Sequence, residues 1–543
     1  MGIRVKSNLV PGRRVVRCLP ALALLCPLIL AAAPPGAVAA HKRHSRRPRV
    51  LRVGSFHGVK GKFKTIQAAV NKARAGDWVL VGPGVYHERD DHSTGPATEG
   101  GPPPAGVLIT TPGVHLRGMN RKKVVVDGTA PHKGKACSSS PSVQDFGTNS
   151  TDGTPQGRNG VVVFKANKTR VDNLTVCNFL GGSGGNGNEI WWNGGDGSGK
   201  IGMGSFKGSY LSATSTFYAG ESTAAEYGIF SSNSSGPGNW FQTYASNFND
   251  SGYYIGACAQ VCNQVMDHAW SEYSALGYSG TNSGGSLLVK NSEFDNNQDG
   301  FDTNSQNNDD APSPQDGACP NNGISPITHT HSCWVFMKNY VHDNNNPDVP
   351  GAGTAAAGPV GTGLSVAGGR NDTVVDNRFV HNGAWGVLFV PYPDTDTPPP
   401  VSHCEGGIQS TGLCLYDDWG NSLLNNQFSG NGFFGNPTNG DFGEITFTDG
   451  HPINCYSGNS APDGSSPSTL AQTNGTCGQA GVADPNPPLL NEVACDSMLL
   501  GTPCVPTDNY PRRQQIVMHP LPNKQLKTMP HPCKKVPKNP WCK

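Results

Sequence analysis

A short motif that recurs along the middle of the chain constrains its fold more than any other feature. The motif is a small residue or Asn, then any residue, then an aromatic residue or Val. Its eight copies are Cys177-Asn178-Phe179, Ser215-Thr216-Phe217, Ser246-Asn247-Phe248, Ser271-Glu272-Tyr273, Ser292-Glu293-Phe294, Asn339-Tyr340-Val341, Asn377-Arg378-Phe379 and Asn426-Gln427-Phe428. Four copies carry Asn three residues after the third position, at Asn297, Asn344, Asn382 and Asn431. A period this short indicates a stack of small repeated units.

Each unit contains short alternating stretches typical of strands, such as residues 286–289 and 386–389, and none contains a helix long enough to cross over a sheet. A parallel coil stacks such units at roughly 4.8 Å per turn. Aromatic side chains then fill the interior, and Asn amides at equivalent turns pair along the stack. With 71 Gly, 44 Pro and 15% charged residues, the composition fits an all-β, turn-rich chain and excludes a helical bundle. A β-sandwich with chance periodicity is the alternative, which eight copies in one register disfavour.

A cap for the open end of the coil is predicted near the N-terminus. Residues 63–74 place Ile66, Ala69, Val70 and Ala73 on one helical face, and a strand is predicted over residues 78–81. A short amphipathic helix of this kind covers the end of a solenoid.

The segment from Phe63 to Glu88, with its helix, Gly-Asp, strand and Pro-Gly-x-Tyr, resembles the opening of right-handed parallel β-helix proteins of the pectate lyase-like superfamily. With the repeats, the resemblance covers about residues 60–450. It implies a right-handed parallel β-helix over residues 51–455. It leaves the activity open, because that superfamily holds lyases, hydrolases, esterases, epimerases and adhesins.

Both ends of the chain differ from the coil. Residues 1–39 begin with basic residues and continue with an apolar run and Ala37-Val38-Ala39, which is typical of a secretory signal peptide. Its removal leaves no expected membrane span and predicts a secreted protein. Residues 40–50 form a basic linker. Residues 456–543, rich in Cys and Pro, are predicted to form a disulfide-stapled cap followed by a basic, extended tail.

Fourteen cysteines remain outside the leader, an even number that fits disulfides in an oxidising compartment. Zinc binding is disfavoured because paired CxxC and HxxxH patterns are lacking. Neighbouring cysteines predict the pairs Cys258–Cys262, Cys319–Cys333, Cys404–Cys414, Cys455–Cys477, Cys495–Cys504 and Cys533–Cys542, and Cys137 and Cys177 then remain.

Charge is divided unevenly along the sequence. All 40 Asp and Glu residues lie within residues 53–511, whereas 19 of the 41 Lys and Arg residues lie outside that range. The basic tails are therefore expected to be solvated and partly disordered, and nucleic acid is not the expected partner. An acidic body repels polyuronates unless calcium bridges them, so a neutral or weakly charged polysaccharide is the easier ligand.

Three long insertions follow the same strand on neighbouring turns. They run over about residues 303–332, 345–362 and 391–420. Because they occupy equivalent points of stacked turns, they should form one wall beside one sheet. Such a wall creates a groove, and extended polymers are natural ligands of grooves along solenoids.

The stretch from Asn296 to Asn304, followed by Asp309 and Asp310, is the richest candidate for chemistry. If Phe301 points inward, alternation turns Asp302 outward toward the groove. Clustered carboxylates can cleave a glycosidic bond as acid and base, hold calcium, or cap turns. The candidate catalytic residues are Asp299, Asp302, Asp309 and Asp310, with Asp302 at their centre.

Residues 297–302, the pair Asp309-Asp310 and residues 361–365 are similar to three successive polygalacturonase motifs. That resemblance implies acid and base roles for Asp299, Asp309 and Asp310. The sequence departs from the family, because only ten residues separate Asp299 from Asp309. Thr362 stands where the family has histidine, and no Arg-x-Lys follows it.

Candidate substrate-binding residues are Tyr254 and Trp385, whose aromatic faces suit sugar rings, and Arg370, which could act beside a cation. Together these features predict a secreted, monomeric β-helix protein that binds extracellular or cell-wall glycan. It would cleave the glycan as a hydrolase or lyase, with calcium as the one cofactor to consider. The alternative is a non-catalytic surface or adhesive scaffold. Convergence of the four aspartates in the groove would favour the enzyme.

Overall fold

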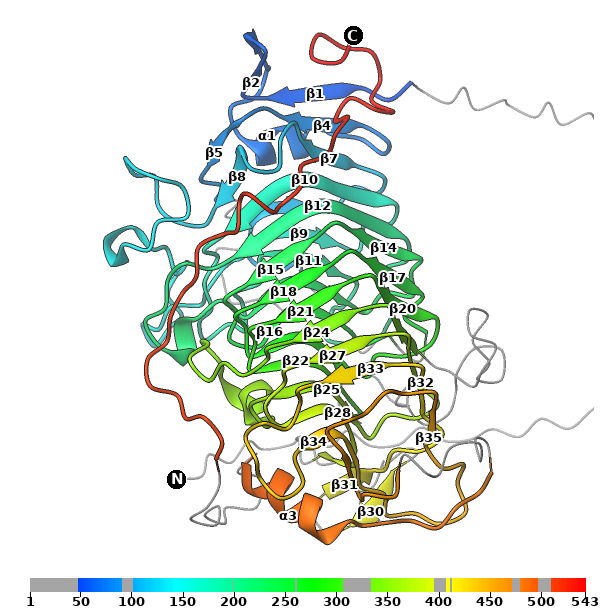
Figure 1. The fold of residues 1–543 in the computed structure, drawn as a ribbon. Coiled ribbons are helices and arrows are strands. Elements are labelled where there is room, and N and C mark those ends of the chain that lie inside the picture. Colours follow the sequence, from blue (N-terminus) through cyan, green and yellow to red (C-terminus); the bar gives the residue numbers. More distant parts are fainter. Residues whose placement is uncertain are drawn as a thin grey trace, which may run out of the picture. The chain divides into compact units, whose positions relative to one another are not determined.

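In a computed structural model, residues 48–543 form one compact unit that is built as a right-handed parallel β-helix (Figure 1). The structure describes residues 47–89, 101–198, 200–258, 261–305, 334–394, 407–410, 413–470, 479–496 and 509–543. The predicted signal peptide lies outside these residues. No helix within them is long and apolar enough to cross a membrane.

Each regular turn of the coil contributes three strands, as in β16 (Ser251–Gly256), β17 (Gln264–Asp267) and β18 (Trp270–Glu272). The first strands of the turns form an eleven-stranded parallel sheet. Its strands are β6 (Ala105–Ile109), β9 (Asn159–Phe164), β11 (Ile190–Asn193), β13 (Tyr227–Ser232), β16 (Ser251–Gly256), β19 (Leu276–Thr281), β22 (Asp299–Asn304), β25 (Thr362–Ala367), β28 (Trp385–Val390), β34 (Gly440–Glu444) and β36 (Ser465–Ser466).

The second and third strands join into one sheet of twenty strands, because β10 and β12 each pair with two strands of a neighbouring turn. Its strands are β1 (Val50–Val53), β4 (Trp78–Val81), β5 (Gly84–Tyr86), β7 (His115–Gly118), β8 (Val124–Asp127), β10 (Thr169–Cys177), β12 (Phe206–Thr214), β14 (Gly238–Phe241), β15 (Tyr244–Ser246), β17 (Gln264–Asp267), β18 (Trp270–Glu272), β20 (Leu287–Lys290), β21 (Glu293–Asp295), β23 (Trp334–Met337), β24 (Tyr340–His342), β26 (Thr373–Val375), β27 (Arg378–Val380), β32 (Ser422–Leu424), β33 (Gln427–Ser429) and β35 (Cys455–Ser457).

Smaller elements decorate the coil. They are the hairpin β2 (Ser55–Phe56) and β3 (Val59–Lys60), the antiparallel β29 (Tyr392–Asp394), β30 (Ile408–Ser410) and β31 (Leu413–Tyr416), the helices α1 (Ile66–Val70) and α3 (Pro487–Asp496), and the 3₁₀ turns η1 (Pro141–Val143), η2 (Glu221–Thr223) and η4 (Gly353–Ala357).

Aromatic side chains fill the interior as expected, but the eight motif copies do not share one register. From residue 294 onward the motif's third residue lies in an inward row, with Phe294, Val341, Phe379 and Phe428 in register. In the earlier turns this row holds the small residues Val176, Ala213, Ala245 and Ser271. There the turn after the strand supplies the bulk, since Phe179 and Phe248 are fully buried. The prediction of a single register was therefore wrong. In the early turns an aromatic residue of the turn fills the interior, whereas in the later turns an aromatic residue or Val of the strand does so.

The predicted asparagine ladder is confirmed. The side-chain amide of each of Asn297, Asn344 and Asn382 donates to the Oδ1 atom of the next ladder residue, at 3.0, 3.1 and 3.1 Å, and the row ends at Asn431. All four residues are buried. Each Oδ1 acceptor also receives a backbone N–H, so the ladder satisfies turn groups that water cannot reach.

The capping helix is present but shorter than the predicted residues 63–74, because α1 spans only Ile66–Val70. The Glu88 carboxylate accepts the Ile66 and Gln67 N–H groups at 2.5 and 3.1 Å and fixes its start. Asp77 accepts the Arg74 N–H at 2.9 Å and holds the chain in a turn before β4. The predicted apolar face is buried against the coil.

Disulfides join Cys258 to Cys262 and Cys533 to Cys542, as predicted, and Cys137 to Cys177, the remaining pair. Cys414 and Cys455 are also disulfide-bonded. Their expected partners Cys404 and Cys477, together with Cys319, Cys333 and Cys504, lie outside the described residues, as does the Cys495 side chain.

The basic C-terminal segment, residues 509–543, is extended but bound to the coil, whereas a solvated tail was expected. It runs back along the coil from its C-terminal turns to its N-terminal ones (Figure 1). The Asn509 N–H donates to Asn436 near one end, and the Trp541 indole donates to the Val59 carbonyl at the other. Between them, the buried Arg117 and Arg121 side chains donate to carbonyls of the tail. The basic residues of the coil thus hold the tail through its backbone.

Candidate functional site

A pocket of about 400 Å³ lies on the outer face of the eleven-stranded sheet, above β16, β19, β22, β25 and β28. One wall comes from the chain around η4 and another from residues 391–393, so two of the three predicted insertions border it. Val493 of α3 adds a further contact that the sequence did not indicate. The third insertion lies almost entirely outside the described residues.

The floor of the pocket is a row of outward side chains in strand register. Tyr254, Ser279, Asp302, Ser365 and Leu388 pair in that order across five strands. Strand alternation produces this arrangement, because the neighbouring Phe301 is fully buried in the interior. The predicted outward position of Asp302 is thus found in the structure.

Asp299 and Asp302 come together at Ser365. The Ser365 hydroxyl lies within hydrogen-bonding distance of Asp302 Oδ1 and 3.4 Å from Asp299 Oδ2. Burial, and next the charge of Asp302, raise the pKa of Asp299 well above its usual value. Burial also raises the pKa of Asp302, to about 6, against hydrogen bonds from Ser365 and Asn304 that lower it. Burial and the charge of its neighbour therefore favour the protonated form of Asp299.

Asp250, which immediately precedes β16, is a third carboxyl in the pocket. Its Oδ2 accepts the Tyr227 hydroxyl at 3.0 Å. Burial raises its pKa to about 7, and the nearby Asp302 charge adds to the increase. Sequence reasoning missed Asp250 because no motif marks it. Its position could have identified it, because Asp250 and Asp299 both lie where a strand of the same sheet begins.

Two carboxylate oxygens at the pocket have no hydrogen-bond partner within the described chain, Asp250 Oδ1 and Asp299 Oδ1, and the amide oxygen Asn304 Oδ1 has none either. Burying a carboxylate oxygen without a partner costs free energy, so both atoms suit a ligand that donates hydrogen bonds. None of the pocket's described lining residues is Lys, Arg or His. Tyr227, Tyr254 and Tyr392 supply aromatic surface.

The other predicted site residues are not brought into this pocket. Asp309 and Asp310 lie outside the described residues. Trp385 is fully buried, and its indole donates to the Thr438 carbonyl at 2.8 Å. Arg370 is buried with its guanidinium 3.6 Å from the centre of the Trp419 ring, and its Nε donates to the Asp417 carbonyl. Of the three substrate-binding candidates, Tyr254 alone lines the pocket.

Calcium at the pocket would have to be held by well-separated oxygens. Asp250, Asp299 and Asp302 do not place three ligand atoms within 4.8 Å of one another. Across the described residues, the group of acidic and histidine side chains that does so is Glu293, Asp295 and His342, on the other sheet.

No protein-family model and no curated protein sequence matches the chain. Among solved structures, it is similar to the mannuronan C-5 epimerase AlgE4 A-module of Azotobacter vinelandii, at 12% identity over 73% of this chain and 90% of that one, with a TM-score of 0.37. It is also similar to pectate lyase Pel9A, at 12% identity over 77% and 78% of the two chains, with a TM-score of 0.35. The tailspike protein 2 domain of bacteriophage CBA120 is similar at 10% identity over 76% and 47%, with a TM-score of 0.33.

Proposed function

We propose that the protein is a secreted, monomeric β-helix hydrolase that binds a neutral or weakly charged extracellular polysaccharide in the pocket and cleaves its glycosidic bonds. The observation that carries this proposal is the pair Asp299 and Asp302, which lie beside one hydroxyl and both have raised pKa values. Two carboxyls with different protonation states are the acid–base pair of glycoside hydrolysis.

In this reaction Asp299, whose protonated form is favoured by burial and by the charge of Asp302, donates its proton to the leaving glycosidic oxygen. Asp302, ionised above its pKa of about 6, either takes a proton from the attacking water or attacks the sugar carbon itself. The first route inverts the anomeric configuration and the second retains it. Ser365 positions both carboxyls through one hydroxyl group.

Hydrolysis is favoured over elimination because of the charges in the pocket. A lyase that acts on uronates needs a cation to bind the uronate carboxylate, and the described lining offers carboxyls but no basic side chain. Tyr254 and Tyr392 offer aromatic surface for sugar rings instead. The intrachain disulfides support secretion, because such bonds persist in oxidising compartments.

The test is a panel of neutral glycans and polyuronates incubated with the purified protein, with and without chelator. We expect cleavage of a neutral glycan that chelator does not reduce. Asp302→Asn and Asp299→Asn should each lower the rate by about 10²–10⁴-fold. Asp152→Asn, at an exposed carboxylate outside the pocket, is the matched control and should leave the rate unchanged.

A glycan that binds the wild-type protein without being cleaved would support the scaffold function instead. In that case the role of Asp302 is to link two strands of the sheet through its hydrogen bond with Ser365. Asp302→Asn would then alter the stability of the fold. Proton NMR of the first product decides between inversion and retention. Size-exclusion chromatography tests the monomeric state.

A further inference from the structure

The outward face of the twenty-stranded sheet carries a second group of ionisable side chains, on a different sheet from the pocket strands. Glu293 and Asp295 of β21 and His342 of β24 point away from the interior, because the alternating Phe294 and Val341 are fully buried. Asp295 and His342 are register partners in adjacent strands. One ligand atom from each of the three residues lies within 4.8 Å of the other two.

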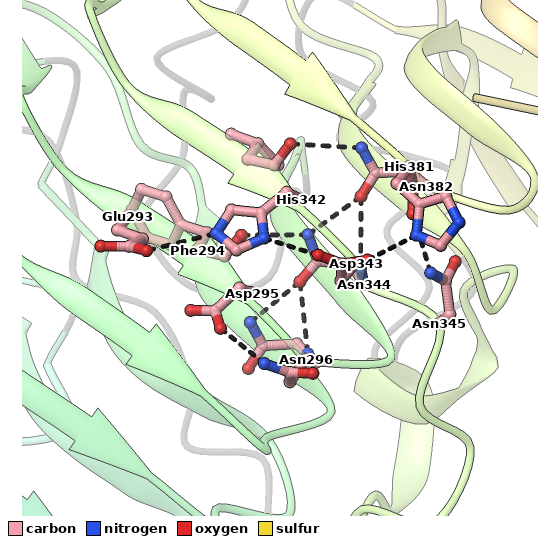
Figure 2. A network of polar contacts seen from close by, with 12 residues as sticks. Glu293, Phe294, Asp295, Asn296, His342, Asp343, Asn344, Asn345, His381 and Asn382 are labelled. Atoms are coloured by element: carbon pink, nitrogen blue, oxygen red, sulfur yellow. Dashed lines mark hydrogen bonds and ion pairs between the residues drawn. The ribbon is translucent and has the colours of Figure 1, made fainter. Parts of the chain in front are cut away.

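His342 has a carboxylate at each ring nitrogen. Its Nδ1 lies 2.8 Å from Asp343 Oδ2, and its Nε2 lies 3.2 Å from Glu293 Oε1, as Figure 2 shows. A neutral imidazole has one N–H and one lone pair. If Nδ1–H donates to Asp343, the Nε2 lone pair faces carboxylate oxygens, and either a proton or a metal ion between them makes that contact favourable.

The partners around the three ligands resemble the outer shell of a metal site. Asp343, which orients His342, also accepts from His381 Nδ1 at 2.5 Å. Asp295 accepts from the Trp270 indole at 2.7 Å and from Asn296 at 2.5 Å, which fixes both of its oxygens. A carboxylate behind the ligating histidine sets its tautomer and raises its basicity toward a metal.

The positive charge beside the two carboxylate ligands comes from His342 when it is protonated, or from a bound cation. Glu272 lies one turn away in register with Asp295, and its carboxylate accepts the Tyr244 hydroxyl. Within the described part of the chain, neither Glu293 nor Asp295 forms an ion pair with Lys or Arg. Arg378, on the next turn, lies over the Tyr340 ring instead.

We propose that Glu293, Asp295 and His342 bind one divalent transition-metal ion, with Zn²⁺ and Mn²⁺ as the ions that fit. A single imidazole nitrogen with carboxylate oxygens suits these metals, whereas calcium prefers oxygen ligands throughout. Ligands of one ion at about 2.1 Å lie at most about 4.2 Å apart, so a small shift closes the site. The Glu293 side chain is 45% exposed, which allows that shift and leaves water the remaining coordination positions.

The site would tie two adjacent turns of the coil together on a face that the glycan pocket does not use. Its occupancy therefore does not depend on the proposed hydrolase function, and either proposal can fail alone. A proton competes with the metal for Nε2, so metal affinity should fall as the pH is lowered below neutrality.

The test is calorimetric titration of the full mature protein, free of any affinity tag and stripped with chelator, with ZnCl₂ and with MnCl₂. We expect one ion per chain at micromolar or lower concentration, checked by elemental analysis after dialysis. His342→Ala and Glu293→Gln should each abolish this ion. Asp343→Asn keeps all three ligands and should weaken binding by about 10–100-fold.

His268→Ala is the matched control, because His268 also contacts a carboxylate, Asp267, on the same sheet but has a single acidic partner. It should bind one ion as the wild type does. Asp302→Asn should also retain the ion, which separates this site from the pocket. If His342→Ala fails to fold, the exposed Glu293→Gln decides. No binding to the wild type, or equal binding to Glu293→Gln, would overturn the proposal.

Discussion

At the scale of single residues, the carboxyls of the pocket link stability to pH. Asp302 has a usual pKa of 3.8 and a pKa of about 6 in the folded protein. A carboxyl whose pKa is raised by folding stabilises the fold while protonated, so its contribution is complete below about pH 4 and is lost as the pH rises through about 6. Burial is the cause, because it disfavours the charged form.

We expect the midpoint of chemical denaturation, measured with chelator present, to fall as the pH is raised from about 4 to about 7. In Asp302→Asn, which cannot ionise, the fall should be smaller. Asp152→Asn is the control, because hydrogen bonds from Ser150 and Thr154 hold the Asp152 pKa at about 2 and leave it ionised throughout. Parallel curves for wild type and Asp302→Asn would show that Asp302 is not buried at the pocket floor.

Individual site residues could be predicted where strand alternation decides their direction. Phe301 and Asp302 are adjacent on one strand, so their side chains point to opposite faces. Because Phe301 was predicted to lie in the interior, Asp302 was predicted to face the pocket. Trp385 and Arg370 are buried outside the pocket, because large side chains with polar groups also serve as interior packing. Their hydrogen bonds go to the carbonyls of Thr438 and Asp417, which are distant in sequence and carry no local signal.

At the scale of elements, the turn ladder and not the strands alone keeps neighbouring turns aligned. Asn382 accepts from the Asn344 side chain and backbone and donates to Asn431 and to the Val341 carbonyl. All of these groups are buried, so none can exchange its partner for water.

Asn382→Ala should therefore lower the free energy of unfolding by about 1–3 kcal/mol, the cost of leaving buried polar groups without partners. Asn459→Ala is the matched control, since Asn459 ends the parallel ladder of Asn377 and Asn426 and is only half-buried. Urea denaturation followed by circular dichroism measures both. A loss for Asn459→Ala as large as that for Asn382→Ala would mean that burial of the ladder is unimportant.

The elements themselves were predictable to different degrees. The strand over residues 78–81 appears with its expected bounds as β4, because four apolar residues lie between turn signals. The capping helix is shorter than expected because two contacts limit it. Glu88, which is distant in sequence, accepts the Ile66 N–H where the helix begins, and Asp77 accepts the Arg74 N–H in the turn after it. The register of the first four motif copies was missed because an aromatic residue can fill the same interior space from a strand or from a turn.

At the scale of the whole molecule, residues 509–543 contact turns that are far apart along the coil. His519 stacks on Tyr273 and bonds to Asn247, whereas Met529 bonds to Asn173 and Trp541 packs near Trp78. In a solenoid each turn contacts its neighbours, so local opening is inexpensive. The tail adds contacts between distant turns.

Truncation after Arg513 should lower the thermal midpoint and loosen the N-terminal turns first. Arg117 and Arg121, which are nearly fully buried, would lose the tail carbonyls that accept their hydrogen bonds. Hydrogen exchange should accelerate in β1 and β4 more than in β27 or β33. The double variant Cys533→Ser/Cys542→Ser retains the tail and should show a smaller effect. An unchanged exchange rate in β4 would show that the tail is not part of the stabilising structure.

The path of this tail also determines when one apolar patch is covered during synthesis of the chain. The outward face of β1 and β4, with Trp78 and Leu80, is synthesised among the first parts of the coil, but Trp541 and Cys542, which pack against it, follow every other turn in the chain. The apolar patch formed first is therefore covered last. During synthesis, this patch stays exposed until the tail that covers it has been made.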